Sequence, residues 1–280
     1  MRIVERLRDC LSPAAGASRI ALVALTAAAF VSRARAADAA RPAALSVAAA
    51  ANLVYALDAL NAEFGKTAPE IAVTSATGAS GSLVAQIAHG APYDVFLSAD
   101  RGFAQALVNA GNADAKSLST FAVGRLVLWT TRAAVDVSDV AGAVRSPLVR
   151  KLAVANVDTA PYGRAAQQAL KALGAWGDAQ PKIVMGENIS QTAQFVETGN
   201  ADAGFVALSI VISPRLKGRG RWTEVPEALH EPLEQCAVIT TRGSANPAAT
   251  RYVAFLNSPA ARAILEAFGY GIPPGAKPGG

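Results

Sequence analysis

The chain has 280 residues, of which 52% are hydrophobic and only 17% are charged, and its formal net charge is +5. Most of the excess charge lies in residues 1–36, which hold six basic and two acidic side chains, so the rest of the chain is close to neutral. That remainder has no run of Lys and Arg, which argues against nucleic acid as a partner. Two His and two Cys in the whole chain give little support for a metal-ligand cluster or a Ser-His-Asp catalytic site.

The first 36 residues have the three parts of a secretory signal peptide. Three arginines near the start are followed by the uncharged run Ile20–Val31 and then by Ala34-Arg35-Ala36, the small-x-small pattern that signal peptidase reads. Twelve apolar residues are too few to span a bilayer, which needs about 20. No cysteine follows the expected cleavage point, which argues against a lipid anchor. We therefore expect residues 1–36 to be removed and an exported protein to begin at Ala37.

Two sets of alternating strands and helices follow. The first set has predicted strands at 45–50, 71–75 and 94–97 and predicted helices at 53–64, 83–88 and 102–110. After a buried strand at 125–130, the second set has strands at 152–155, 183–185 and 203–206 and helices at 165–173 and 191–197. The chain closes with a strand at 236–240, helices at 247–256 and 259–268, and a Gly/Pro-rich tail, 273–280, that we expect to be flexible.

This alternation predicts an α/β fold of mainly parallel sheets with helices on both faces. Two similar sets imply two lobes, the first made of residues 37–123 and 239–280 and the second of residues 124–238. Hinge strands are expected near 121–130 and 234–241. Ligands of such sheets bind beyond the carboxyl ends of the strands, so the predicted binding site is a cleft between the lobes.

Four predicted helices begin with a short polar or glycine-containing turn that directly follows a strand. These turns are Asn52, Thr77–Ser82, Pro161–Gly163 and Asn188–Ser190. A helix N-terminus presents unpaired N–H groups and about half a positive charge. Four of them converging would bind an anion without any charged side chain, an arrangement that suits a fully ionised dianion. The alternative is that these polar residues are ordinary helix caps.

At these same turns the chain resembles a known family, the periplasmic molybdate-binding proteins of ABC importers. The similar segments are AAAANL (48–53), GASGSLVAQI (78–87), GAPYDVFLSAD (90–100), APYGRAAQQAL (160–170), GFVALS (204–209) and SPAARAILEAFGYGI (258–272). The resemblance implies a two-lobed type II periplasmic binding protein that is not an enzyme and has no cofactor. It implies that the chain captures molybdate, and also tungstate, in the periplasm as a monomer and delivers it to an inner-membrane ABC permease.

The resemblance also implies which residues bind the oxyanion. They are the first turn, the hydroxyl and N–H of the second, and one backbone N–H from each of the last two: Ala51, Asn52, Ser80, Tyr162 and Ile189. No bare metal cation is implied, because molybdenum is bound as molybdate through these residues. Some members add a tyrosine hydroxyl at the position of Ala207, which cannot donate from its side chain. The Asn52 amide or the Tyr162 phenol could replace that contact.

Two other functions stay open at this point. A binder of another tetrahedral oxyanion, such as sulfate or thiosulfate, would need the same kind of site, and the sequence does not measure its width. A more distant alternative is a secreted hydrolase that uses Ser80 or Ser82 as its nucleophile. That reaction needs a general base beside the serine, and neither His89 nor His230 lies in a supporting motif.

Overall fold

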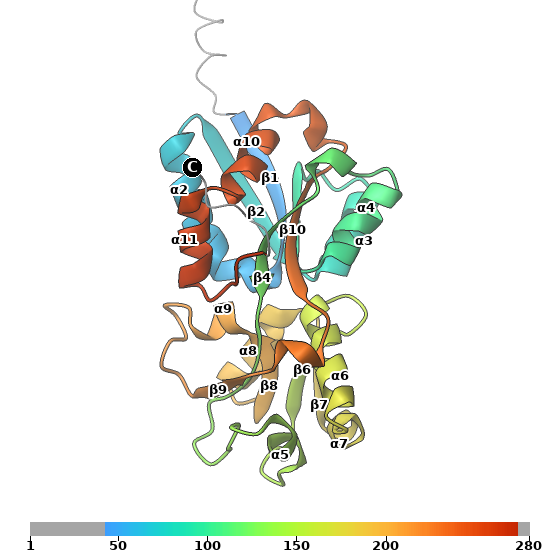
Figure 1. Ribbon diagram of the computed structural model, residues 1–280, viewed down its shortest axis with the longest axis vertical. Coiled ribbons are helices and arrows are strands. Elements are labelled where there is room, and N and C mark those ends of the chain that lie inside the picture. Colours follow the sequence, from blue (N-terminus) through green and yellow to red (C-terminus); the bar gives the residue numbers. More distant parts are fainter. Residues whose placement is uncertain (1–42, 274–280) are drawn as a thin grey trace, which may run out of the picture. The chain divides into compact units, whose positions relative to one another are not determined.

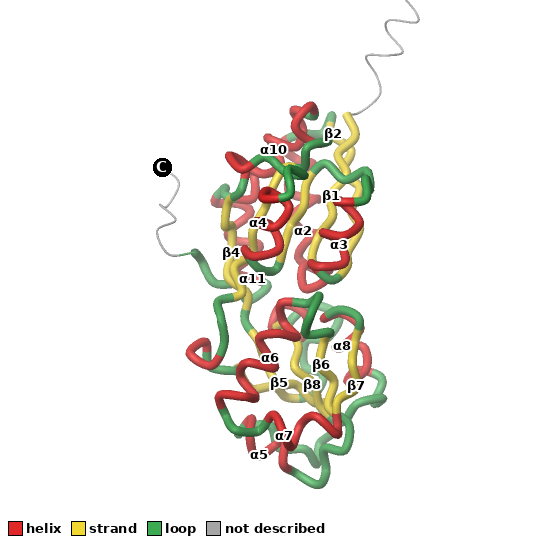
Figure 2. Tube along the Cα trace, turned by 90° about the vertical axis from the view of Figure 1, so that its right-hand side faces the viewer, coloured by secondary structure: helices red, strands yellow, loops and turns green. Residues whose placement is uncertain are grey.

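The computed structural model describes residues 43–273. The expected signal peptide, its cleavage point and most of the expected flexible tail lie outside these residues. Within the described part of the chain, no helix combines the length and the apolar character needed to cross a membrane. The described residues form two five-stranded sheets, each flanked by helices on both sides, and we call each sheet with its helices a lobe (Figures 1 and 2).

The first lobe is built on a mixed sheet of strand order β2-β1-β3-β10-β4. β1 is parallel to β2 and β3, and β10 is antiparallel to both β3 and β4. The strands are β1 (Ala43–Ala50), β2 (Ile71–Gly78), β3 (Val95–Ser98), β4 (Ser119–Gly124) and β10 (Leu233–Ile239). The helices are α2 (Val54–Thr67), α3 (Ser80–Ala88), α4 (Arg101–Asn109), α10 (Pro247–Leu256) and α11 (Pro259–Ala267), with short 3-10 turns η2 (Ala51–Leu53), η3 (Ala115–Ser117) and η6 (Gly243–Ala245).

Side-chain alternation along the first sheet divides its core into two layers. Leu45, Val47 and Ala49 of β1 pack with α2, α10 and α11, whereas Ala48 packs with α3 and α4. Successive residues of a strand point to opposite faces, so a strand covered on both faces must be apolar throughout. This explains the unbroken apolar run of β1 and fixes its carboxyl end, where η2 begins, between the two layers.

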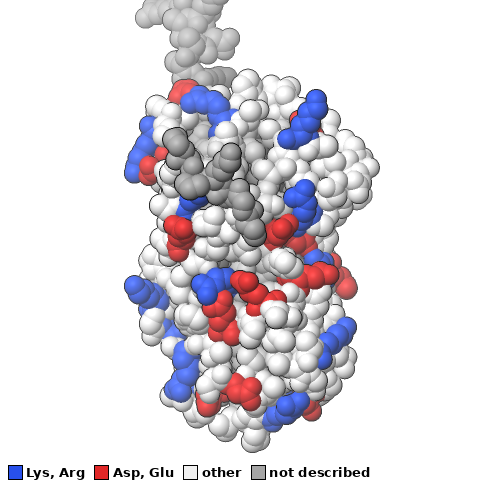
Figure 3. Space-filling view, viewed as in Figure 1, with Lys and Arg blue, Asp and Glu red and all other residues white. Residues whose placement is uncertain are grey.

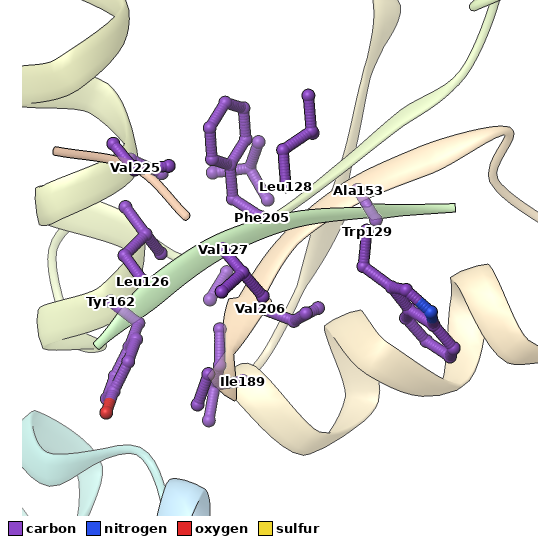
Figure 4. Close-up of a cluster of buried hydrophobic side chains, with 14 of the residues drawn as sticks. Leu126, Val127, Leu128, Trp129, Ala153, Tyr162, Ile189, Phe205, Val206 and Val225 are labelled. Carbon is purple, nitrogen blue, oxygen red and sulfur yellow. The ribbon is translucent and has the colours of Figure 1, made fainter. Parts of the chain in front are cut away.

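The second lobe is built on a mixed sheet of order β7-β6-β8-β5-β9, in which β5 is antiparallel to β8 and β9. The strands are β5 (Leu126–Thr130), β6 (Leu152–Ala155), β7 (Ile183–Gly186), β8 (Ala203–Ala207) and β9 (Arg221–Glu224). The helices are α5 (Val140–Arg145), α6 (Pro161–Ala172), α7 (Trp176–Ala179), α8 (Ile189–Glu197) and α9 (Leu208–Val211), with turns η4 (Gln180–Lys182) and η5 (Glu227–Leu229). Every residue of β5 is buried, and its side chains pack against Phe205, Val206 and Val225 (Figure 4).

Two chain crossings join the lobes. The first runs from β4 into β5 at Gly124, close to the predicted boundary after residue 123. The second predicted boundary, between 238 and 239, is wrong because it falls inside β10, which pairs with β3 and β4 of the first sheet. The chain therefore returns to the first lobe between Glu224 and Leu233, and residues 233–238 belong to that lobe.

Candidate oxyanion site

The five residues that the sequence analysis singled out line one pocket between the lobes. The empty space there is about 190 Å³, a volume that includes solvent at the open side of the pocket. The lining is Ala50, Ala51, Asn52, Gly78, Ala79, Ser80, Ala99, Ala160, Pro161, Tyr162, Asn188 and Ile189. Ala51, Asn52, Ser80, Tyr162 and Ile189 are each at most 4% exposed. No residue of this lining has a charged side chain, so any anion held here would meet neutral groups only.

Three of the four helix starts at this pocket have no capping side chain. The cap positions of η2, α3 and α6 are the alanines Ala50, Ala79 and Ala160, and none of them makes a side-chain hydrogen bond to the helix. The first N–H groups of a helix have no partner within it and are normally satisfied by a cap, by water or by a ligand. The simple capping explanation therefore fails at these three starts. Some of their N–H groups have other partners, because Gly81 donates to the Thr159 carbonyl at 2.8 Å and Gly163 to the Ala160 carbonyl at 2.9 Å.

The fourth start, at α8, is capped. Asn188 Oδ1 accepts hydrogen bonds from the N–H groups of Ser190, at 3.0 Å, and Gln191, at 3.1 Å. Capping is thus the correct explanation for Asn188 itself. The cap uses the second and third N–H groups of the helix, and the N–H of Ile189 is not part of it.

The Ser80 hydroxyl has one partner and one hydrogen left to donate. Its Oγ accepts from the backbone N–H of Ala99 at 3.1 Å, which orients the hydroxyl within the pocket. A serine hydroxyl is both a donor and an acceptor. Because the acceptor side is used by Ala99, the hydroxyl hydrogen is directed elsewhere, and the side chain is only 1% exposed. The arrangement provides a donor and no base that could activate the oxygen.

The Asn52 amide does not point its hydrogens at an anion in this structure. Its Nδ2 donates to Gln235 Oε1 at 2.8 Å and to the Tyr270 hydroxyl oxygen at 2.9 Å, which uses both amide hydrogens. The Tyr270 hydroxyl in turn donates to the Asn52 carbonyl at 3.0 Å, so this orientation of the amide is fixed. The expectation that this side chain replaces the missing tyrosine donor is therefore corrected, and Asn52 can serve the pocket only through its backbone N–H.

The Tyr162 phenol projects from α6 toward segments of the first lobe (Figure 4). Its oxygen is buried without a hydrogen-bond partner, as is Asn52 Oδ1. Burial raises the pKa of the Tyr162 hydroxyl well above its ordinary value, so the phenol stays neutral. Ala207, at the position where some relatives have a tyrosine, does not line the pocket.

Direct contacts between the lobes close the pocket. Ser190 Oγ of α8 donates to the Ala51 carbonyl at 2.8 Å, and Ser209 Oγ of α9 donates to the Asn52 carbonyl at 2.9 Å. On the opposite side, the Gly81 N–H donates to the carbonyl of Thr159 at 2.8 Å. Each of these hydrogen bonds joins a residue of the first lobe to a residue of the second, so the structure represents a closed form.

An ion pair lies beside the pocket and also joins the lobes. Asp100 caps α4 by accepting from the Phe103 N–H at 2.8 Å, and its other oxygen pairs with Arg164 of α6. Elsewhere on the face shown in Figure 3, basic and acidic side chains are interspersed rather than segregated. Among residues 43–273, no group of three or more His, Cys, Asp and Glu is placed to hold a metal ion.

Several residues of the site were not found from the sequence. Gln235, Tyr270, Ser209 and Gly124 all contact pocket residues, yet each comes from a segment far along the chain from its partner. The available signal was a single uncharged polar residue, Gln235, within the apolar strand β10. Its partner could not be named, because the contact joins residues 183 positions apart.

Comparison with known proteins places the chain among exported binding proteins. Residues 45–271 match the family model described as bacterial extracellular solute-binding protein. The chain is 41% identical to the molybdate-binding protein ModA of Azotobacter vinelandii over 235 residues, covering 84% of this chain and 92% of that protein. It is also 41% identical to ModA of Rhodobacter capsulatus, covering 81% and 91% of the two chains. The resemblance drawn from the sequence is confirmed.

Solved structures of binding proteins are also similar to this chain. The Azotobacter vinelandii periplasmic molybdate-binding protein superposes with a TM-score of 0.77 at 36% identity, covering 82% of this chain and 99% of that one. The sulfate-binding protein SubI of Mycobacterium tuberculosis superposes with a TM-score of 0.68, but at 15% identity, covering 84% and 88%. At 15% identity, the similarity to SubI shows a shared two-lobed fold and gives no information about the ligand.

Proposed function

Because the chain belongs to the bacterial extracellular solute-binding proteins, we propose that it captures molybdate, and also tungstate, in the periplasm. In this proposal it acts as a monomer and delivers the anion to an inner-membrane ABC permease. The relatives at 41% identity carry molybdate binding in their names, and the structure at 36% identity is described as periplasmic. The signal peptide expected at residues 1–36 agrees with this location. Proteins of this family bind solutes and are not enzymes.

The observation that carries the proposal is the set of uncapped helix starts around a buried, neutral pocket. Alanine at three of the four cap positions costs helix stability of about 1 kcal/mol each relative to a polar cap. Such a loss is understandable if the uncapped N–H groups bind a ligand. Together with the Ser80 hydroxyl and the Ile189 N–H, they offer neutral donors from both lobes to one anion. We therefore propose that five residues donate hydrogen bonds to the anion: Ala51, Asn52, Ser80, Tyr162 and Ile189.

The sulfate-type alternative is less well supported. A sulfate-binding protein shares the fold, but its 15% identity carries no information on this chain's ligand. The hydrolase alternative has little geometric basis. The partner of the Ser80 oxygen is a backbone N–H rather than a base, and His89 is exposed, with its Nδ1 on the Ala85 carbonyl at 2.7 Å.

Replacing Ser80 with Ala is expected to weaken molybdate binding by about tenfold or more. A hydrogen bond to a charged group contributes roughly 1.5–3 kcal/mol, and each 1.4 kcal/mol corresponds to about tenfold in affinity. Calorimetric titration of the purified protein measures the change. Ser82→Ala, two residues further along the same helix, is the matched control and should bind as the wild type does. An unchanged affinity in a folded Ser80→Ala protein would contradict the assignment.

A further inference from the structure

Gln235 is a fully buried polar side chain at the crossing between the lobes, and it lies outside the set of proposed anion ligands. It belongs to β10, next to a bulge in the pairing of β10 with β4. Its side chain is 0% exposed, and all of its hydrogen-bonding groups are used. Oε1 accepts from Asn52 Nδ2 at 2.8 Å, and Nε2 donates to the carbonyls of Leu233, at 2.8 Å, and Ala99, at 3.3 Å.

The first lobe contributes three segments to the pocket, residues 50–52, 78–80 and 99, and these contacts reach the first and the third. Gln235 Oε1 holds the Asn52 amide, and with it the η2 turn, whose residues Ala51 and Asn52 line the pocket. Gln235 Nε2 holds the carbonyl of Ala99. The N–H of Ala99 in turn donates to Ser80 Oγ at 3.1 Å and so orients the Ser80 hydroxyl. A single side chain thus sets the spacing between the η2 donors and the Ser80 donor.

Tyr162 of the second lobe approaches the same side chain across Gly124, the last residue of β4. A Cβ atom at Gly124 would overlap the hydroxyl of Tyr162 and lie 2.9 Å from Gln235 Nε2. Glycine at the β4–β5 crossing therefore lets the phenol of α6 and the Gln235 amide pack over the same backbone. The start of α6, which carries the Tyr162 N–H, is in this way placed against the group that positions the first-lobe donors.

We propose that Gln235 is a positioning residue that fixes the separation of the anion donors and so determines which anion size the closed site accepts. This inference rests on the proposed oxyanion-binding function. A buried side chain whose hydrogen-bonding groups are all used is held in one arrangement. Gln235 meets this condition, although Asn52 Oδ1 in the same cluster has no partner. Without Gln235, the Asn52 amide and the Ala99 turn each lose a partner, and the donors around the pocket can adopt more than one spacing.

The test is Gln235→Met in the mature protein, titrated by calorimetry with molybdate and with sulfate. Met has a similar unbranched shape, but it can neither donate the two hydrogen bonds of Gln235 Nε2 nor replace the amide oxygen as an acceptor. We expect molybdate affinity to fall about tenfold or more and the ratio of molybdate to sulfate affinity to narrow. Glu234→Gln, the neighbouring position on β10, is the control and should change neither quantity. A lower melting temperature with an unchanged affinity ratio would mean that Gln235 is merely structural and would overturn the proposal.

A double-mutant cycle with Asn52→Ala tests whether Gln235 acts through the asparagine. Asn52→Ala keeps the backbone N–H, so the expected result is that Gln235→Met costs clearly less affinity in that background than alone. Fully additive effects would overturn the proposal. If Gln235→Met does not fold, Gln235→Asn, which keeps both groups but is one methylene too short, carries the same expectations. Failure of the wild type to bind any oxyanion would overturn the proposed function and this inference together, whereas tight wild-type binding with an unaltered variant would overturn this inference alone.

Discussion

Replacing Asn52 with Asp is expected to reduce molybdate affinity by about a thousandfold or more. The two side chains have nearly the same shape, and Asn52 is 1% exposed in the lining of the pocket. Two unit charges about 4 Å apart interact by about 4 kcal/mol at the effective dielectric of a partly buried site, and the anion carries two. That repulsion alone corresponds to about three orders of magnitude. Calorimetric titration near neutral pH measures the loss.

The same variant is also expected to be less stable without ligand. Asp cannot donate to Gln235 Oε1 or to the Tyr270 hydroxyl, which both accept from the Asn52 amide. Asn52→Ala separates the two effects, because it removes the amide without adding charge and should therefore bind molybdate much better than Asn52→Asp. If Asn52→Asp bound as tightly as the wild type, a negative charge at this position would lie too far from the anion to repel it, and the anion would not be bound in this pocket.

Replacing Gly163 with Ala is expected to destabilise the protein by about 3 kcal/mol and to abolish tight anion binding. Gly163 is the third residue of α6 and follows Tyr162, a proposed N–H donor. A Cβ atom here would overlap the carbonyl oxygen of Ala155 and lie 2.8 Å from that of Asn156. Both obstacles are backbone, so the start of α6 has to move. Thermal melting and molybdate titration measure the two consequences.

Gly65→Ala is the matched control for this substitution. Gly65 lies within α2, and a Cβ atom added there meets nothing within 4 Å. Glycine inside a helix costs roughly 0.5–1 kcal/mol relative to alanine, so this variant should be slightly more stable than the wild type and bind normally. A Gly163→Ala protein that melts and binds as the wild type does would show that the α6 start tolerates displacement.

The sequence predicted the elements whose pattern is strong and local. The apolar strands β1, β3, β6 and β8 and the amphipathic helices α2, α4, α6 and α8 all appear near their expected positions. β9 was not predicted, because its sequence RWTE is polar and it forms the exposed edge of its sheet. The helices α5, α7 and α9 were not predicted either, since each has six residues or fewer and gives little periodic signal.

The candidate site was predictable in part for a similar reason. The helix starts are encoded next to strands, so Ser80, Tyr162 and Ile189 could be named from local turns and from the resemblance. What holds them was not predictable, because Gln235 and Tyr270 reach Asn52 only after the chain has crossed between the lobes. The same long-range contacts explain why the direction of the Asn52 amide was wrongly expected. From the sequence alone, a polar side chain at a helix start is interpreted as a ligand donor, because its distant hydrogen-bond partners are not known.

Neutral donors from the two lobes are expected to close around one tetrahedral dianion of a particular size. Calorimetric titration of the mature protein with molybdate, tungstate, sulfate and phosphate tests it most directly. Molybdate and tungstate share shape and charge and should bind alike. Sulfate is smaller, and two unmade hydrogen bonds at roughly 1.5–3 kcal/mol each should weaken it by about a hundredfold or more. Sulfate binding as tightly as molybdate would contradict the claim and favour the sulfate-type receptor.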